Sequence, residues 1–111
     1  MSEFIVILST CSNRDEAARI AHALVEARLA ACVAITPTVQ SVYRWKGSVE
    51  ESAECGLTIK TRAELFPHVR DELTRLHSYE VPEILALPVL DGNTDYLTWI
   101  KNETALPSER L

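Results

Sequence analysis

Apolar positions in the first quarter of the chain follow two different periods. Phe4 to Thr10 is a continuous apolar run rich in β-branched residues, which is typical of a strand buried on both faces. Asn13 followed by Glu16 resembles a capping box that opens a helix. We expect this helix to end near Arg28, because apolar residues then recur at helical spacing: Ala17, Ile20, Ala21, Leu24, Val25 and Leu29.

The middle of the chain predicts a long hairpin. A second strand runs over Ala31–Ile35 and resumes over Val39–Trp45. Thr36-Pro37-Thr38 interrupts it, and a proline inside a strand indicates an edge strand or a bulge. Lys46-Gly47-Ser48 predicts a tight turn. A third strand follows, clearest where Cys55, Leu57 and Ile59 alternate with Gly56, Thr58 and Lys60.

Two helices and one strand are predicted in the second half. Thr61 with Glu64 resembles another capping box, and the regular helix is expected from about Leu65, with Pro67 in its first turn. Its apolar stripe is Leu65, Val69, Leu73 and Leu76. A buried strand over Ile84–Val89, a turn at Asp91-Gly92-Asn93, a helix over Thr94–Asn102 and a frayed tail from Ala105 complete the chain.

This order, β-α-β-β-α-β with an extra C-terminal helix, predicts an α+β fold of the ferredoxin-like type. It is a four-stranded antiparallel sheet with two helices on one face and a long hairpin between the second and third strands. We expect one domain spanning residues 1–111, with its core from about residue 4 to residue 102. Because no second helical layer covers the other face of the sheet, another subunit is the natural cover.

The predicted hairpin also indicates that another subunit covers part of this chain. Tyr43 and Trp45 share a face by period two on a ribbon that also carries Val39, Val42 and Val49. An apolar ribbon that protrudes into water needs a partner to bury it, so these aromatics are predicted interface anchors. The alternative is that both side chains fold back onto their own sheet.

Composition narrows the classes of partner. The net charge is −5, and the 11 Lys and Arg residues are scattered, which argues against nucleic acid. The apolar opening Phe4–Leu8 follows Glu3 and is too short for a signal peptide or a membrane span. Cys11, Cys32 and Cys55 are widely spaced, so reduced thiols in a cytoplasmic protein are expected rather than a disulfide framework.

The segment His77-Ser78-Tyr79-Glu80-Val81-Pro82-Glu83 holds the densest polar chemistry of the chain. It joins a predicted helix to a predicted strand, and loops held by a rigid scaffold are where function concentrates. With Ala27–Val33, Ser41–Gly47, Ile59-Lys60-Thr61 and Gly92-Asn93 followed by Tyr96–Trp99, it resembles the CutA family of divalent-cation tolerance proteins, over about residues 4–102. The resemblance implies a homotrimer, similar in architecture to the PII signalling proteins, whose hairpins pair with neighbouring subunits.

The resemblance also implies a link to copper tolerance. Family members that tolerate copper carry a Cys at the end of the first strand and two adjacent His before the Tyr-x-x-Pro-Glu loop. Ser9 and Leu76 stand at two of these positions here, and only His77 is kept. Cu(II) and Zn(II) favour imidazole and thiolate, so the expected weak site uses His77 with Cys11, Glu80 and Glu83. The alternative for His77 is an imidazole that contacts the last carbonyls of its helix.

Two other classes of function are open. Acylphosphatases share the topology and hold a phosphoryl group with Arg and Asn, but the turn Thr10–Arg14 lacks the glycines of a phosphate cradle, so no enzyme activity is expected. A PII-like sensor would bind a small molecule in a cleft between subunits. Candidate residues for such a pocket are Trp45, Lys60, Tyr79, Glu83, Tyr96 and Trp99, with Lys60 expected to pair with Glu83 or Glu80.

Overall fold

The computed structural model describes residues 2–109. Its elements are β1 (Phe4–Cys11), α1 (Arg14–Glu26), β2 (Cys32–Trp45), β3 (Ser48–Arg62), α2 (Phe66–Leu76), β4 (Leu85–Pro88) and α3 (Thr94–Glu103), with short 3-10 turns at Ala63–Leu65 and Pro107–Glu109. Within these residues, no helix has the length and apolarity needed to cross a membrane. The predicted order of elements is confirmed.

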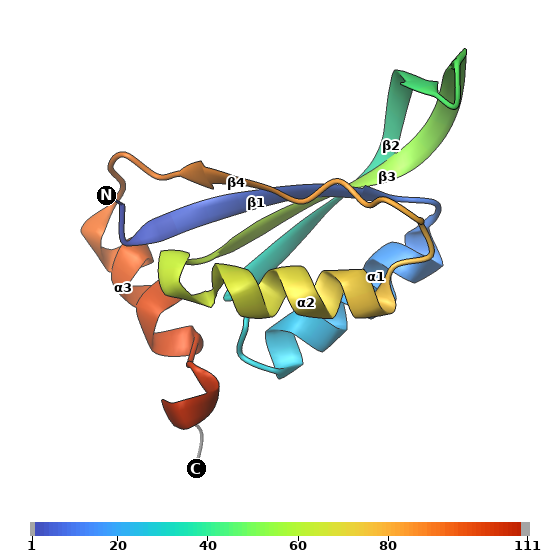
Figure 1. The fold of residues 1–111 in the computed structure, drawn as a ribbon. Coiled ribbons are helices and arrows are strands. Elements are labelled where there is room, and N and C mark those ends of the chain that lie inside the picture. The colour runs from blue at the N-terminus through green and yellow to red at the C-terminus, as the bar shows by residue number, and fades with distance from the viewer. Residues whose placement is uncertain (1, 110–111) are drawn as a thin grey trace.

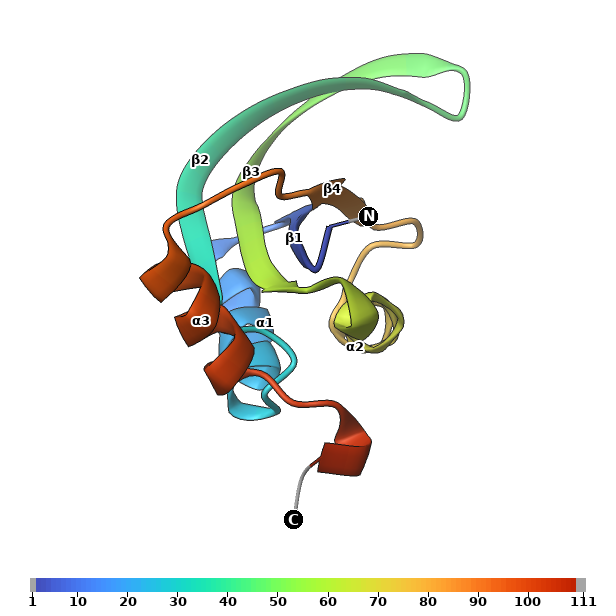
Figure 2. The same cartoon turned by 90° about the vertical axis from the view of Figure 1, so that its left-hand side faces the viewer.

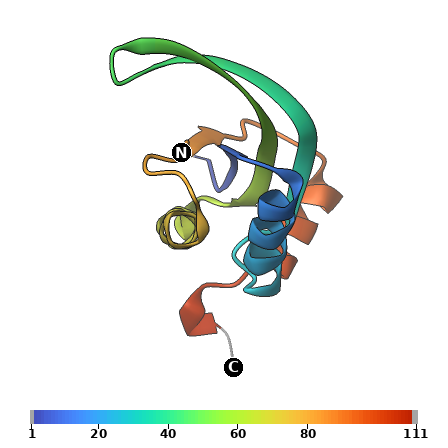
Figure 3. The same ribbon diagram turned by 90° about the vertical axis from the view of Figure 1, so that its right-hand side faces the viewer.

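The four strands form one antiparallel sheet in the order β2-β3-β1-β4. This is the arrangement expected of a ferredoxin-like α+β fold. Helices α1 and α2 lie together on one face of the sheet, whereas α3 lies beside the start of β2 (Figures 1 and 3). Strands β2 and β4 are the two edges of the sheet, and within residues 2–109 each pairs with only one other strand.

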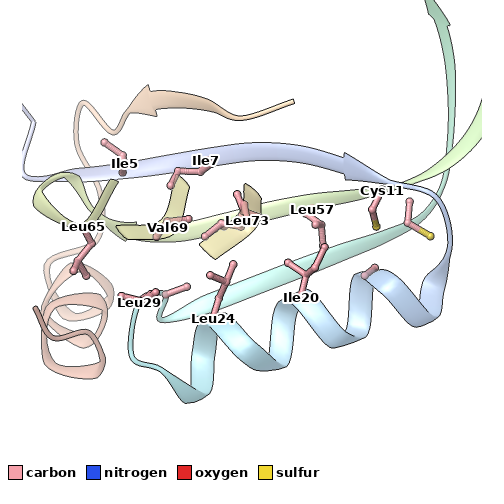
Figure 4. Packing of buried hydrophobic residues seen from close by; sticks show 14 residues of the cluster. Ile5, Ile7, Cys11, Ile20, Leu24, Leu29, Leu57, Leu65, Val69 and Leu73 are labelled. Atoms are coloured by element: carbon pink, nitrogen blue, oxygen red, sulfur yellow. The ribbon is translucent and has the colours of Figure 1, made fainter. Parts of the chain in front are cut away.

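The hydrophobic core lies between the sheet and α1 and α2. Side chains of β1 alternate between buried and half-buried, so the prediction of a strand buried on both faces is wrong for this chain on its own. The reason is that only the helix-facing residues are covered, among them Ile7 and Cys11 (Figure 4). Against them pack Ile20 and Leu24 from α1 and Val69 and Leu73 from α2.

Both ends of α1 are closed by local hydrogen bonds. The Asn13 side chain accepts from the Glu16 backbone N–H at 2.8 Å, which confirms the predicted cap. The helix ends at Glu26, two residues earlier than expected, because Arg28 adopts a left-handed conformation with φ 60°. Arg28 and Leu29 donate to the carbonyls of Val25 and Leu24, which is a Schellman motif with arginine where glycine is usual.

The β2–β3 hairpin extends well beyond the rest of the sheet and curves over it (Figure 2). Its two-residue turn is Lys46-Gly47, both with positive φ, as a type I′ turn requires. The register shifts between Thr36 and Val39, so the predicted interruption is a bulge. Gly56 lies opposite, where an added Cβ would come within 3.2 Å of the Val39 side chain. The bulge and this glycine allow the ribbon to bend.

The start of α2 differs from the prediction. Thr61 and Glu64 form no capping box, because the Thr61 hydroxyl donates to the Leu29 carbonyl and Glu64 pairs with Arg62. A 3-10 turn precedes the helix, which begins at Phe66 with Pro67 in its first turn, as expected. Tertiary partners thus take the side chains that a local signal assigns to the cap.

Strand β4 was expected to be buried, and this is wrong for the single chain. It covers only Leu85–Pro88, and all four residues are exposed, with Leu85 at 56% and Leu87 at 47%. The reason is its place at the sheet edge, where β1 is its only strand neighbour among the described residues. An apolar edge strand that is exposed to water tends to pair with a strand of another chain.

The tail after α3 is held in place, in contrast to the fraying expected from Ala105. Arg62, with a side chain 6% exposed, donates to the Thr104 hydroxyl and carbonyl and to Glu109. The Ala105 N–H donates to the Arg28 carbonyl, and Leu106 packs against the core. These contacts organise the chain through Glu109, and the last two residues lie outside the described part.

Candidate functional site

Three segments meet at one end of the sheet: the end of β1, the first turn of α1 and the loop after α2. We call this region the loop junction and define it by Ser12, Glu16, His77, Ser78 and Tyr79. The Glu16 side chain is only 4% exposed. Its carboxylate accepts from the Ser12 N–H at 3.0 Å, the Ser12 hydroxyl at 2.8 Å and the Ser78 N–H at 2.8 Å. One carboxylate therefore joins α1 to the loop.

The charge of Glu16 is maintained by these donors. Burial alone would raise its pKa, but the hydrogen bonds from Ser12 and Ser78 outweigh burial and lower the pKa from 4.5 to about 2. Glu16 also differs from the predicted capping box, since its carboxylate binds the N–H of Ser12 rather than that of Asn13. The sequence identified this glutamate as a helix cap and missed its bond to the loop 62 residues away.

Both ring nitrogens of His77 are engaged, and its side chain is fully buried. Nδ1 accepts from the Tyr79 N–H at 3.1 Å, so Nε2 carries the proton and donates to the Thr10 carbonyl at 2.7 Å. His77 thus fastens the loop to the end of β1. The sequence offered two interpretations of His77, a metal ligand or an imidazole that contacts the last carbonyls of its own helix. Neither anticipated its bond to the Thr10 carbonyl of β1.

Tyr79 extends the junction to the base of the hairpin. Its hydroxyl donates to Glu54 Oε2 at 2.5 Å, and Glu54 is only 8% exposed. Burial and the adjacent Glu54 carboxylate raise the pKa of Tyr79 well above its usual range. The ring also lies 4.7 Å from that of His77. Tyr79 and Glu54 therefore connect the loop to the strand that carries the hairpin.

Cys11 lies in this region, although it was expected to be beyond the end of the strand. It is the last residue of β1, is fully buried and pairs in register with the buried Cys55. Burial, with the nearby Glu16 and Cys55, raises the pKa of Cys11 to about 11. Such a thiol stays protonated and is a poor metal ligand. Cys32 is half-buried, because it lies on the uncovered side of the sheet.

The residues at the predicted copper position do not fit a copper centre. Ser9 replaces the thiol, and its buried hydroxyl has no hydrogen-bond partner in the described part of the chain. His77 has no free nitrogen, and Leu76 packs against the core. Glu80 and Glu83 are exposed, and Glu80 lies 4.0 Å from Lys46. Within residues 2–109, no three His, Cys, Asp or Glu side chains are grouped so that they could hold a metal ion.

The predicted pocket residues divide into separate groups. Lys60 does not pair with Glu83 or Glu80; its ammonium lies 5.8 Å from the centre of the Tyr96 ring, on the sheet face away from α1 and α2. The Tyr96 and Trp99 rings lie 5.4 Å apart. Three predicted residues are thus together, whereas Tyr79 belongs to the loop junction. Tyr43 and Trp45 are exposed on the hairpin at 43% and 40%.

Asn13 and Arg14, which the phosphoryl-transfer alternative would need, serve other roles. The Asn13 side chain caps α1, and Arg14 is exposed at its first turn. The arrangement at this end of the sheet is thus a buried set of hydrogen bonds that orders a loop and the base of a hairpin. This geometry defines a class: a ferredoxin-like α+β protein with a long curved hairpin and a loop junction held by buried hydrogen bonds.

The comparisons with known proteins identify the family. The profile of the CutA1 divalent ion tolerance protein family matches residues 5–103. The chain is 48% identical over 99 residues to the divalent-cation tolerance protein CutA of Thermus thermophilus, covering 89% of this chain and 96% of the relative. It is 45% identical over 102 residues to human Protein CutA, covering 92% of this chain and 57% of the relative. The chain belongs to the CutA1 divalent ion tolerance family.

Solved structures agree with this assignment. The divalent cation tolerance protein (Cut A1) from Thermus thermophilus superposes with a TM-score of 0.90 at 46% identity, covering 92% of this chain and 99% of that one. The chain spans little more than half the length of the human, mouse and plant relatives that it matches. Relatives differ in stated location, with a chloroplastic form from Arabidopsis thaliana and a periplasmic one from Archaeoglobus fulgidus. The family is described by tolerance of divalent ions rather than by a reaction.

Proposed function

We propose that this protein acts as a homotrimer that contributes to divalent-cation tolerance, the role stated in the names of its relatives. The observation that carries the assembly is the exposed β4 edge. Leu85 and Leu87 lie beside Val6 and Leu8 of β1 on the sheet face away from α1 and α2, which we call the open face. An apolar edge and face of this kind are stable in water only when another subunit covers them.

The hairpin supplies the matching surface. Val42 and Val49 are 63% and 61% exposed on it, and they accompany the half-exposed Tyr43 and Trp45. Strands β2 and β4 are the two free edges of the sheet, so β2 of one copy can pair with β4 of the next. Such head-to-tail contacts form a closed ring when the rotation between copies is right. Three copies is the number that the family resemblance implies.

Light scattering at micromolar concentration tests the assembly. The wild type is expected at three times the 12.4 kDa of one chain. Leu87→Lys places a charge on the β4 edge and should dissociate the particle. Val25→Lys is the matched control, because Val25 is similarly exposed, at 42%, but lies on α1 in the helical layer. A wild type that remains a monomer refutes the proposal.

Direct contact with Cu(II) or Zn(II) is proposed to be weak and to involve exposed carboxylates such as Glu80 and Glu83 rather than His77. The support is that His77 is buried with both nitrogens bonded. Calorimetric titration of Cu(II) into wild type and His77→Gln should give indistinguishable isotherms. Loss of binding in a His77→Gln protein of unchanged circular dichroism would contradict this.

A second candidate is a small-ligand sensor of the PII type with a pocket between subunits. The observation that favours it is the group formed by Lys60, Tyr96 and Trp99, which combines a cation with two partly exposed rings. Thermal-shift measurements with small acids and nucleotides test this candidate. A sensor should unfold at a higher temperature when its ligand is present, whereas a protein without a ligand should not. The cytoplasmic location expected from the sequence stays a prediction.

A further inference from the structure

The open face of the sheet carries one lysine in an apolar row. Register pairs Lys60 with Cys32 on β2 and with Val6 on β1, and Val6 in turn with Leu87 on β4. The next row toward the hairpin holds no charged residue: Ala34, Thr58, Leu8 and Leu85. Lys60 is therefore a half-buried residue whose neighbours across the strands, Cys32 and Val6, carry no charge. The nearest charged residue along β3 is Arg62, which already pairs with Glu64 and Glu109.

Lys60 also has no carboxylate partner among the described residues. None of the ion pairs within residues 2–109 includes it, and both glutamates expected to pair with it are elsewhere, since Glu80 lies near Lys46 and Glu83 is exposed. Its contact is the Tyr96 ring at 5.8 Å. A cation over an aromatic face is stabilised by a modest free energy. This is far less than the free energy that the cation would lose if its hydration were removed.

Two aromatic rings lie beside this lysine: Tyr96 next to its ammonium and Trp99 next to Tyr96. Tyr96 and Trp99 are 41% and 42% exposed, with ring centres 5.4 Å apart. Trp99 also borders a shallow cavity of about 300 Å³ between α1 and α3. The other residues that line this cavity are Val25, Glu26, Arg28, Ala30, Ala31 and Glu103. The cation and the flat apolar rings are thus adjacent on the open face, whereas this cavity, which Lys60 and Tyr96 do not line, lies to one side of them.

We propose that Lys60, backed by Tyr96 and Trp99, is the recognition group of a carboxylate-binding site on the open face. The inference rests on the proposed function in one respect: the trimer covers this face. Covering an unpaired ammonium is costly unless an anion arrives with it. The carboxylate has two alternative sources. It belongs to a free small acid with a flat body, or to the exposed Glu50 or Glu51 of another copy's hairpin.

Benzoate is the probe for a free acid, and benzamide is its uncharged control. In calorimetry on the intact protein, benzoate should bind and benzamide should not. Lys60→Met should weaken benzoate at least about tenfold, the usual effect of removing a charged hydrogen-bond partner. Lys60→Arg should retain binding, because it keeps the charge. Lys101→Met is the matched control, since Lys101 lies on α3 but pairs with Glu3 at 3.5 Å.

If the carboxylate that binds Lys60 comes from a glutamate of another copy, the same experiments give a different result. Benzoate then fails to bind, while Lys60→Met and a hairpin variant, Glu50→Gln or Glu51→Gln, each lower the midpoint of trimer dissociation. The double variant loses no more than the worse single one, because the two groups form one pair. If benzoate does not bind and the two losses simply add, the proposal is overturned. Light scattering on the same samples reports the trimer independently, so failure of the assembly and failure of the site are distinguishable.

Discussion

Glu16→Gln tests whether the loop junction depends on a buried charge. Glutamine keeps the volume of the side chain but replaces one carboxylate oxygen with an NH₂ group. That group faces donors from Ser12 or Ser78, so a hydrogen bond is lost and two donors are brought together. The fall of the Glu16 pKa from 4.5 to about 2 corresponds to at most ~3 kcal/mol of unfolding free energy at pH 7.

The sign of the pH dependence follows from the direction of that shift. Because the folded-state pKa lies below the unfolded one, the contribution is complete above about pH 4.5 and disappears as the pH falls toward 2. Guanidinium chloride unfolding at fixed chain concentration, from pH 7 to pH 2.5, measures it. Glu16→Gln should be less stable by ~2–3 kcal/mol at pH 7, with the difference shrinking in acid.

Glu26→Gln on the same helix is the control. The Glu26 side chain is 77% exposed, so this change should alter stability by less than about 0.5 kcal/mol. The reasoning is refuted if Glu16→Gln matches wild type at pH 7. It is refuted equally if the loss at pH 7 persists unchanged at pH 2.5, because a loss independent of pH would reflect packing rather than charge.

Three further changes test other parts of the structure by the same unfolding measurement. Arg28→Gly should stabilise by about 1 kcal/mol, since glycine accepts the left-handed φ of 60° without strain; a loss of stability would contradict this. Arg62→Met should cost about 2 kcal/mol and speed amide exchange over residues 104–109, whereas the exposed Arg70→Met should do neither. Tyr79→Phe should cost about 2 kcal/mol by leaving the buried Glu54 without its donor; equal losses in Tyr43→Phe, at an exposed tyrosine, would refute a special role for Tyr79.

Local signals in the sequence predicted the elements well where neighbours along the chain decide them. The period of apolar residues located α1 and α2, and Lys46-Gly47 marked the hairpin turn, because both features depend on short-range geometry. Pro37 marked the bulge for the same reason. Local signals failed where distant partners compete, as at Thr61 and Glu64, which bond to Leu29 and Arg62 instead of capping a helix.

The candidate site was predicted less completely. The polar loop His77–Glu83 was identified, but the carboxylates that hold it, Glu16 and Glu54, come from a helix and a strand far away in the chain. Arg62 was missed as well, because its role appears only when the tail folds back onto it. A glutamate in the first turn of a helix was the only available signal, and it indicated a cap.

The sequence by itself determined the order of elements, the hairpin with its turn and bulge, and the family, because these depend on periodicity, on backbone preference and on blocks of residues in order. Tertiary structure alone decided which polar groups meet. It directed His77 to Thr10, Tyr79 to Glu54 and Lys60 to the Tyr96 ring. Contacts across the fold depend on how the sheet bends and how the helices pack, which no local pattern encodes.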